Sequence, residues 1–98
     1  MTTSTTTGFL SAYDFDGDPD ALLAGYDKLL ASFPPETLIL NVCIQRDGGI
    51  TVYDTCPDRP TFEAFSTSDD FANALSGAGL PAPTAVRPLG AIHQAIAR

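Results

Sequence analysis

Two periodicities of apolar positions alternate along this chain and predict its helices and strands. Between residues 18 and 33, apolar side chains recur at spacings of three and four, the period of a helix that lies on a sheet. Between residues 38 and 55, apolar and polar side chains alternate with a period of two, which is typical of strands. The predicted elements are a strand over 10–15, a helix over 18–33, a two-stranded hairpin over 38–55, a helix over 68–76 and a strand over 84–93.

The residues at the predicted helix ends support these boundaries. Asp18 is a natural N-cap, and Pro19 suits the first helical turn. Pro34 and Pro35 end the first helix, because proline has no N–H and disfavours helix in the residue before it. Ser68 is the expected N-cap of the second helix, which follows a short helical turn at residues 58–65.

The order of these elements indicates the fold. Strand, helix, hairpin, helix and strand form the β-α-β-β-α-β pattern of an α+β, ferredoxin-like domain with a four-stranded antiparallel sheet. In that fold the first and third strands are central and the last lies at an edge, where Pro88 is tolerated. The helices of one such unit cover only one face of the sheet, so we expect the other face to meet a partner or a ligand. We predict one domain over residues 9–98, preceded by a disordered polar tail over residues 1–8.

The length of the hairpin loop decides which side chains share a face. A two-residue loop, Asp47-Gly48, places Thr51 beside Ile44, whereas a three-residue loop with a glycine bulge places Val52 there. We favour the longer loop because it gathers apolar side chains beneath the helices: Leu38, Leu40, Val42, Ile44 and Val52. The opposite face would then carry a mixed set: Ile39, Asn41, Cys43, Gln45, Thr51, Tyr53 and Thr55.

Composition narrows the classes of partner. The chain has 98 residues, of which 44% are hydrophobic and 17% charged, as expected for one foldable domain. A net charge of −7 argues against nucleic acid and against an anionic membrane surface. There is no apolar run of the roughly 20 residues that a membrane span needs and no signal-peptide pattern at the start, so we expect a cytoplasmic protein.

The cysteines and the histidine give no metal pattern. The spacing of Cys43 and Cys56 resembles no zinc motif, and His93 is the single histidine. In a cytoplasmic protein both thiols are expected to stay reduced. We therefore expect no metal and no other cofactor.

Residues 51–71, TVYDTCPDRPTFEAFSTSDDF, resemble the strand–turn–helix segment of the dimeric α/β-barrel superfamily, the antibiotic-biosynthesis-monooxygenase-like proteins. The similarity extends loosely over residues 9–93. It implies a homodimer whose two sheets close a barrel, with a ligand cleft between sheet and helices in each subunit. Haem-degrading members use a tryptophan and a helical histidine. This chain has no tryptophan, and its histidine lies in the last predicted strand, so haem cleavage is not expected.

Two classes of function follow from the resemblance, and the sequence leaves open whether the protein is an enzyme. The favoured class is a non-catalytic dimeric module that binds a small hydrophobic ligand in the cleft or simply stabilises an assembly. The alternative is a cofactor-independent monooxygenase, or an isomerase or cyclase, that acts on an aromatic or polyketide-like substrate.

Two side chains are candidates for catalysis. His93 has the only side chain that ordinarily titrates near neutrality, so it is the first candidate for proton transfer. The alternative for His93 is a surface or interface histidine near the C-terminus. The Tyr53 hydroxyl could orient a phenol or quinone, and its alternative is to fill the barrel.

Five further residues are candidates for ligand binding. A buried Asn41 amide needs several hydrogen bonds, from a ligand or across a dimer interface. Arg87 could hold an anionic group or pair with an acid on the surface. Tyr13 could reach the ligand or serve as a core aromatic, and Phe62 and Phe65 are expected to face the core and line the cleft.

Overall fold

The computed structural model describes residues 8–32 and 40–94. Of the predicted features, the polar tail up to residue 7, the end of the first helix at residue 33, the proline pair and the first two hairpin residues lie outside this range. The elements are β1 (Phe9–Asp16), α1 (Pro19–Ala31), β2 (Asn41–Arg46), β3 (Gly49–Cys56), α2 (Arg59–Ser66), α3 (Asp69–Gly77) and β4 (Ala85–Ala91).

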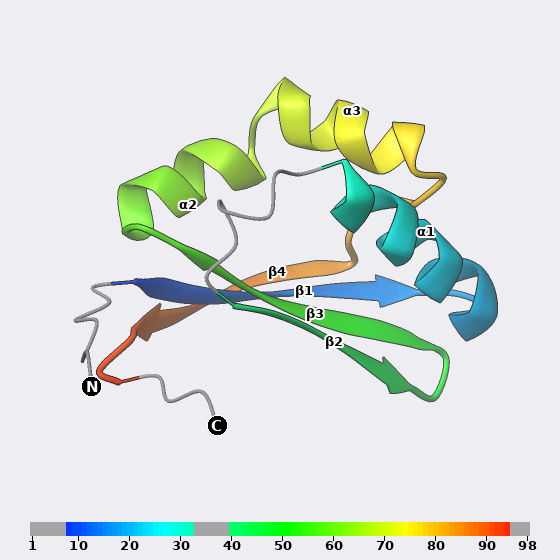
Figure 1. The fold of residues 1–98 in the computed structure, drawn as a ribbon, viewed down its shortest axis with the longest axis horizontal. Coiled ribbons are helices and arrows are strands. Elements are labelled where there is room, and N and C mark those ends of the chain that lie inside the picture. Colours follow the sequence, from blue (N-terminus) through cyan, green and yellow to red (C-terminus); the bar gives the residue numbers. More distant parts are fainter. Residues whose placement is uncertain (1–7, 33–39, 95–98) are drawn as a thin grey trace.

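The four strands form one open antiparallel sheet in the order β2-β3-β1-β4. The three helices lie on one side of it (Figure 1). This confirms the α+β class and the central positions of the first and third strands, an arrangement compatible with a small ferredoxin-like fold. Pro88 lies in the edge strand β4, beside a register shift against β1, so its missing N–H interrupts no interior ladder.

Side-chain caps fix where the helices begin. The Asp18 carboxylate accepts a hydrogen bond from the backbone N–H of Ala21 at 3.1 Å, and the Ser68 hydroxyl accepts one from that of Phe71 at the same distance. Both N-caps were predicted from the sequence. Asp58 caps α2 in the same way, so the predicted helical turn is a helix of its own. No helix within the described ranges is long and apolar enough to cross a membrane.

The turn between β2 and β3 has two residues, Asp47 and Gly48, and the predicted three-residue loop is wrong. Gly48 has φ 76°, a backbone conformation that residues other than glycine rarely adopt. Gly49 already belongs to β3, where it pairs with Arg46. A Cβ at Gly49 would collide with the carbonyl oxygen of Phe15, so only glycine fits where the strand approaches β1 this closely.

This register reverses the predicted faces of β2. Ile44 pairs with Thr51 and Val42 pairs with Tyr53, so both apolar side chains point away from the helices. Val42 and Ile44 are 41% and 44% exposed, and Leu40 before them is 41% exposed. The alternate positions of β2, Asn41 and Cys43 among them, face the helices. In β3 the faces are as predicted.

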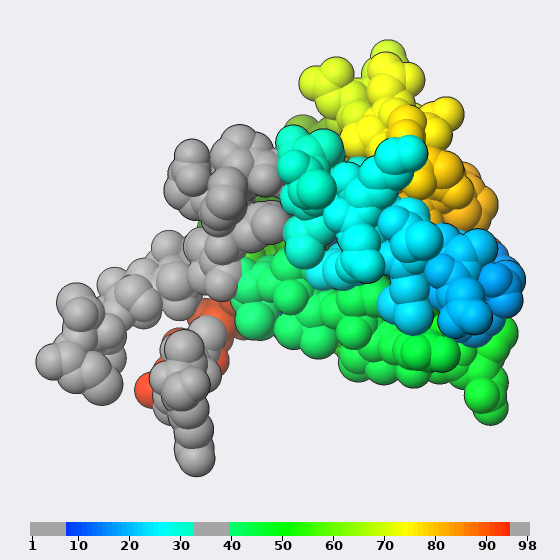
Figure 2. Space-filling model, turned by 45° about the vertical axis from the view of Figure 1, so that its right-hand side comes forward, coloured from blue at the N-terminus to red at the C-terminus, as the bar shows by residue number. Residues whose placement is uncertain are grey.

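The core lies between the sheet and the helices and is rich in aromatic rings. The Phe71 ring packs at a tilt against Tyr13 of β1 and Phe65 of α2, with ring centroids 5.3 Å and 4.8 Å apart. Phe62 of α2 packs 5.5 Å from Phe9. In the space-filling view α1 lies between α3 and the β2–β3 hairpin (Figure 2). The helices are therefore held to the sheet by large apolar contacts.

Candidate functional site

A cavity of about 360 Å³ lies between the helices and the sheet face that they cover. Its volume falls within the range of small-molecule pockets in proteins. Most of its walls are apolar: Phe15, Leu29, Leu30, Val52, Cys56, Pro57, Phe65, Phe71 and Leu80. Its polar groups come from Tyr13, Tyr26, Asn41, Asp54, Thr55 and Thr61. An apolar cavity with a few polar groups is suited to hold and orient a small molecule.

Tyr13 lines this cavity, but its hydroxyl group is enclosed by the protein. The residue is only 3% exposed, and within the described parts of the chain its hydroxyl makes no hydrogen bond. Burial raises its pKa to about 12, against a smaller opposing effect of the Ser11 hydroxyl, so the phenol is neutral near pH 7. A buried hydroxyl without a partner costs about 1–3 kcal/mol. The hydroxyl is therefore an unfavourable group within the packed core, and it is not exposed to the cavity.

Three other polar side chains form a chain of hydrogen bonds at the cavity. The Tyr26 hydroxyl of α1 donates to Oδ1 of Asn41, and Nδ2 of Asn41 donates to Oδ1 of Asp54 at 3.1 Å. The chain links α1 to β2 and β3. Both bonds run toward Asp54, which therefore acts as the terminal acceptor.

Asp54 is an acid on the apolar face of a central strand. Burial raises the pKa of its carboxyl, and the hydrogen bonds from Asn41 and from the backbone N–H of Thr55 oppose this only in part. A carboxyl with a raised pKa beside a cavity is a candidate for taking up or releasing a proton.

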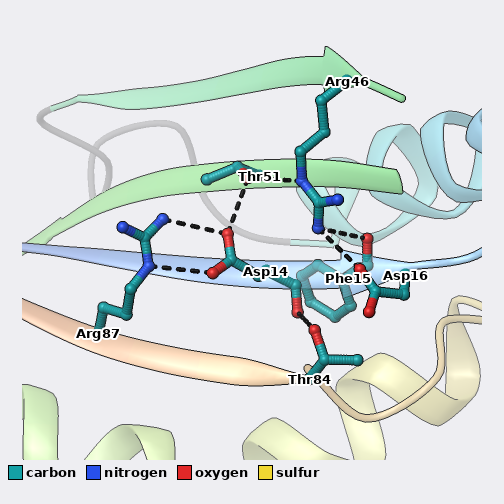
Figure 3. Close-up of polar contacts among 7 residues, drawn as sticks. All are labelled: Asp14, Phe15, Asp16, Arg46, Thr51, Thr84 and Arg87. Carbon is teal, nitrogen blue, oxygen red and sulfur yellow. Dashed lines mark hydrogen bonds and ion pairs between the residues drawn. The ribbon is translucent and has the colours of Figure 1, made fainter. Parts of the chain in front are cut away.

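The opposite face of the sheet carries a network of paired charges (Figure 3). Arg87 donates from Nε and Nη2 to the two carboxylate oxygens of Asp14 at 3.0 and 3.1 Å, and Thr51 donates to Asp14 at 2.8 Å. Arg46 binds Thr51 and forms an ion pair with Asp16 at 2.9 Å. Burial would raise the pKa of Asp14, but the bonds from Thr51 and Arg87 outweigh it and lower the pKa. Each charged side chain in this network therefore has a partner of opposite charge, and the network extends over all four strands.

The structure distributes the predicted site residues over four places. Tyr13, Asn41 and Phe65 line the cavity, and Phe62 lies in the neighbouring core. The two catalytic candidates lie elsewhere: Tyr53 points from the face away from the helices, as does Arg87, and His93 is exposed beyond the end of β4. These three side chains therefore do not converge with Asn41 on one cleft.

Asp54 and Tyr26 were missed as site residues. The signal for Asp54 is its position in β3, where Ile50, Val52 and Cys56 alternate on the same face. An acid in such an apolar series indicates either a partner in the protein or a role toward a ligand. Tyr26 belongs to the apolar stripe of α1, where its hydroxyl gives no separate pattern.

Neither cysteine is in a disulfide, and burial raises the pKa of both thiols. Over residues 8–32 and 40–94, no three His, Cys, Asp or Glu side chains lie close enough together to hold a metal ion.

Comparisons with family models, with curated proteins and with solved structures gave no match for this chain. The resemblance to the dimeric α/β-barrel superfamily thus stays a prediction from residues 51–71.

Proposed function

We propose that the protein binds one small, largely apolar molecule in the cavity between its sheet and its helices. The observation that carries the proposal is the cavity itself, a space of about 360 Å³ with mostly apolar walls and the Asp54 carboxyl among its lining. Protein interiors are close-packed, so an unfilled apolar space of this size is typical of a ligand site. The volume and the apolar lining favour a ligand of the size of one or two fused rings.

Filling the cavity tests this proposal. Leu29 lines the cavity from α1, so Leu29→Trp places a large ring in the space that the ligand would occupy. Ala72→Trp, at an exposed position of α3, adds the same ring outside it. With 2-naphthol as the probe and ligand-observed NMR as the readout, we expect at least a tenfold loss of affinity in Leu29→Trp alone. Equal affinity in both variants would contradict the proposal.

We also propose that a second copy of the chain covers the open face of the sheet. Three exposed side chains, Leu40, Val42 and Ile44, form an apolar strip along β2, and the charges beside it are already paired within the face. Because the charges are paired, burying this face against an identical one costs less than burying unpaired charges would. This arrangement corresponds to the homodimeric barrel of the superfamily that residues 51–71 resemble, and membership of that superfamily is part of the proposal.

A second candidate function is proton transfer by an isomerase or cyclase, and Asp54 is the observation that favours it. Its carboxyl lines the cavity and has a raised pKa, as a general base or acid requires. The test is exchange of the α-protons of 2-tetralone in D₂O, followed by NMR. Catalysed exchange that disappears in Asp54→Asn would support this candidate, and exchange at the uncatalysed rate would contradict it.

A further inference from the structure

The proposed function leaves open which polar group the bound molecule carries, and the polar side chains of the cavity bear on that question. Tyr26 donates its hydroxyl hydrogen to Asn41, and Asn41 donates to Asp54. The Asp54 carboxylate accepts a second hydrogen bond from the backbone N–H of Thr55. A carboxylate offers about four acceptor sites, so about two remain for a ligand. This end of the cavity therefore suits a ligand group that donates hydrogen bonds.

Asp54 lies at the cavity and is only half-buried. In β3 it alternates with Val52 and Cys56, which line the same cavity. Side chains two residues apart along a strand project to one face of the sheet. The Tyr13 hydroxyl, by contrast, is enclosed by the protein and plays no part toward a ligand. Asp54 is thus the acidic group that a molecule in the cavity would meet.

The charges around the cavity disfavour an anion. No lysine or arginine is among the described residues that line it. Arg46, Arg59 and Arg87 each pair with an acid elsewhere, and Lys28 is exposed on α1. An anionic ligand would meet the Asp54 carboxylate without a balancing cation.

Further negative charge acts on the groups that line the cavity. Burial raises the pKa of the Tyr26 hydroxyl, and the charges of Asp27 and Asp54 are among the further causes that raise it. Burial likewise raises the pKa of the Cys56 thiol, and the charges of Asp54 and Asp58 add to the effect. A site surrounded by charges of one sign attracts ligands of the other sign, so these acids favour a cation.

We infer that the cavity selects a small amine with an apolar body, whose protonated nitrogen donates hydrogen bonds to the Asp54 carboxylate. The inference rests on the proposed function. An ammonium group has three donors and a positive charge, so it fills the remaining acceptor sites and balances the carboxylate. A neutral donor would fill the same sites but leave a partly buried charge without a counter-charge. The remainder of the molecule lies against the apolar walls.

Three probes that share one ring system test the inference: 2-(aminomethyl)naphthalene, 2-(hydroxymethyl)naphthalene and 2-naphthoate. Near pH 7 the first is a cation, the second is neutral and the third is an anion. Their affinities for the full chain are measured by ligand-observed NMR at about 0.15 M salt, which screens attraction to exposed acids. We expect the amine to bind about tenfold more tightly than the alcohol, because charge-assisted hydrogen bonds are the stronger kind. We expect 2-naphthoate to bind most weakly.

One pair of variants locates the preference. Asp54→Asn removes the charge with little change in size, so it should abolish the advantage of the amine and leave the affinity of the alcohol nearly unchanged. Asp70→Asn is the matched control, because Asp70 is exposed on α3 and is not among the residues that line the cavity. The control should keep the full advantage of the amine.

A second measurement needs no variant and serves even if Asp54→Asn fails to fold. Nδ2 of Asn41 donates to the carboxylate that the amine would meet. In ¹H–¹⁵N spectra of the labelled chain, saturating amine should therefore shift the side-chain amide signals of Asn41 more than saturating alcohol does. Unchanged Asn41 side-chain signals with bound amine would contradict the inference.

The outcomes separate this inference from the proposal beneath it. An amine that binds no more tightly than the alcohol, or 2-naphthoate as the tightest probe, would overturn the inference and leave the apolar site standing. A preference for the amine that persists in Asp54→Asn would also overturn it, since general attraction to an acidic chain would then be the cause. Failure of all three probes to bind the folded chain would overturn both.

Discussion

At the residue scale, the buried Tyr13 hydroxyl lowers the stability of the core. Tyr13→Phe removes a buried group without a hydrogen-bond partner, so we expect the free energy of unfolding to rise by about 1 kcal/mol. Urea denaturation followed by circular dichroism measures the change. The matched control is Tyr26→Phe, which removes a hydroxyl that donates to Asn41 and should lower stability by a similar amount. Equal losses in both variants would show that Tyr13 has a partner.

Asp54 gives a prediction on pH. Because its pKa in the folded chain is raised above the ordinary 3.8, ionisation of Asp54 costs stability as the pH rises through the folded value. Asp54→Asn removes that cost. The stability of the variant relative to the wild type should therefore increase from about pH 4 to about pH 7 in urea titrations.

Asp14→Asn is the control for this pH series. The pKa of Asp14 is lowered, so its stabilising contribution is already present above the ordinary 3.8 and is lost only as the pH falls through the folded value. The difference between Asp14→Asn and the wild type should thus stay nearly constant from about pH 4 to about pH 7. A constant difference for Asp54→Asn as well would contradict the burial of Asp54.

The sequence predicted some of the residues that line the cavity, but it missed the acid among them, Asp54. Asn41 was a candidate because a buried amide needs hydrogen-bond partners, and Tyr13 and Phe65 because aromatic side chains were expected in the core or the cleft. Asp54 was overlooked although it alternates with Ile50, Val52 and Cys56 along the third strand. The register between β1 and β3 places its side chain on the face that the helices cover. Tyr53 and His93 were chosen for their chemistry, whereas convergence depends on side-chain direction.

At the element scale, α1 packs unusually closely on the segment after α3. A Cβ at Gly25 would lie 2.8 Å from Cδ2 of Leu80 and 3.3 Å from the carbonyl oxygen of Ala78. We expect Gly25→Ala to lower the free energy of unfolding by about 1–3 kcal/mol, because the clash outweighs the gain of about 1 kcal/mol in helix propensity. Thermal and urea denaturation measure the change.

Gly77→Ala is the matched control for Gly25→Ala. Gly77 is the last residue of α3, and a Cβ there would meet no atom within 4 Å. We expect the variant to be as stable as the wild type or up to about 1 kcal/mol more stable. If Gly25→Ala behaves in the same way, α1 is not pressed against Leu80 as the structure describes.

Element positions were predictable, but the hairpin register was not. Helix starts follow from local caps such as Asp18 and Ser68, and strand order follows from the β-α-β-β-α-β pattern. On β2, however, the side chains of both faces include apolar ones. The expectation that the more apolar face lies beneath the helices therefore favoured the wrong loop length. The register depends instead on two glycines. Gly48 adopts the positive φ that the two-residue turn requires, and Gly49 permits the close approach of β3 to the carbonyl oxygen of Phe15.

At the scale of the whole molecule, the apolar strip Leu40, Val42 and Ile44 predicts association. Sedimentation equilibrium at micromolar concentration should give twice the chain mass of 10.3 kDa. Ile44→Asp places an unpaired charge in the strip and should give single chains. Ala72→Asp adds the same charge on exposed α3 and should stay dimeric. A monomeric wild type would remove the second copy from the account and leave the cavity unaffected.

The central claim is that a small molecule binds between the sheet and the helices, and chemical-shift mapping tests it most directly. Two-dimensional ¹H–¹⁵N spectra of the labelled chain are recorded as 2-naphthol is added. We predict the largest shifts at residues whose side chains line the cavity, such as Tyr13, Asn41 and Phe71, with small shifts at Ile44 and Arg87 on the open face. Saturable shifts confined to the open face, or no saturable shifts, would contradict the claim.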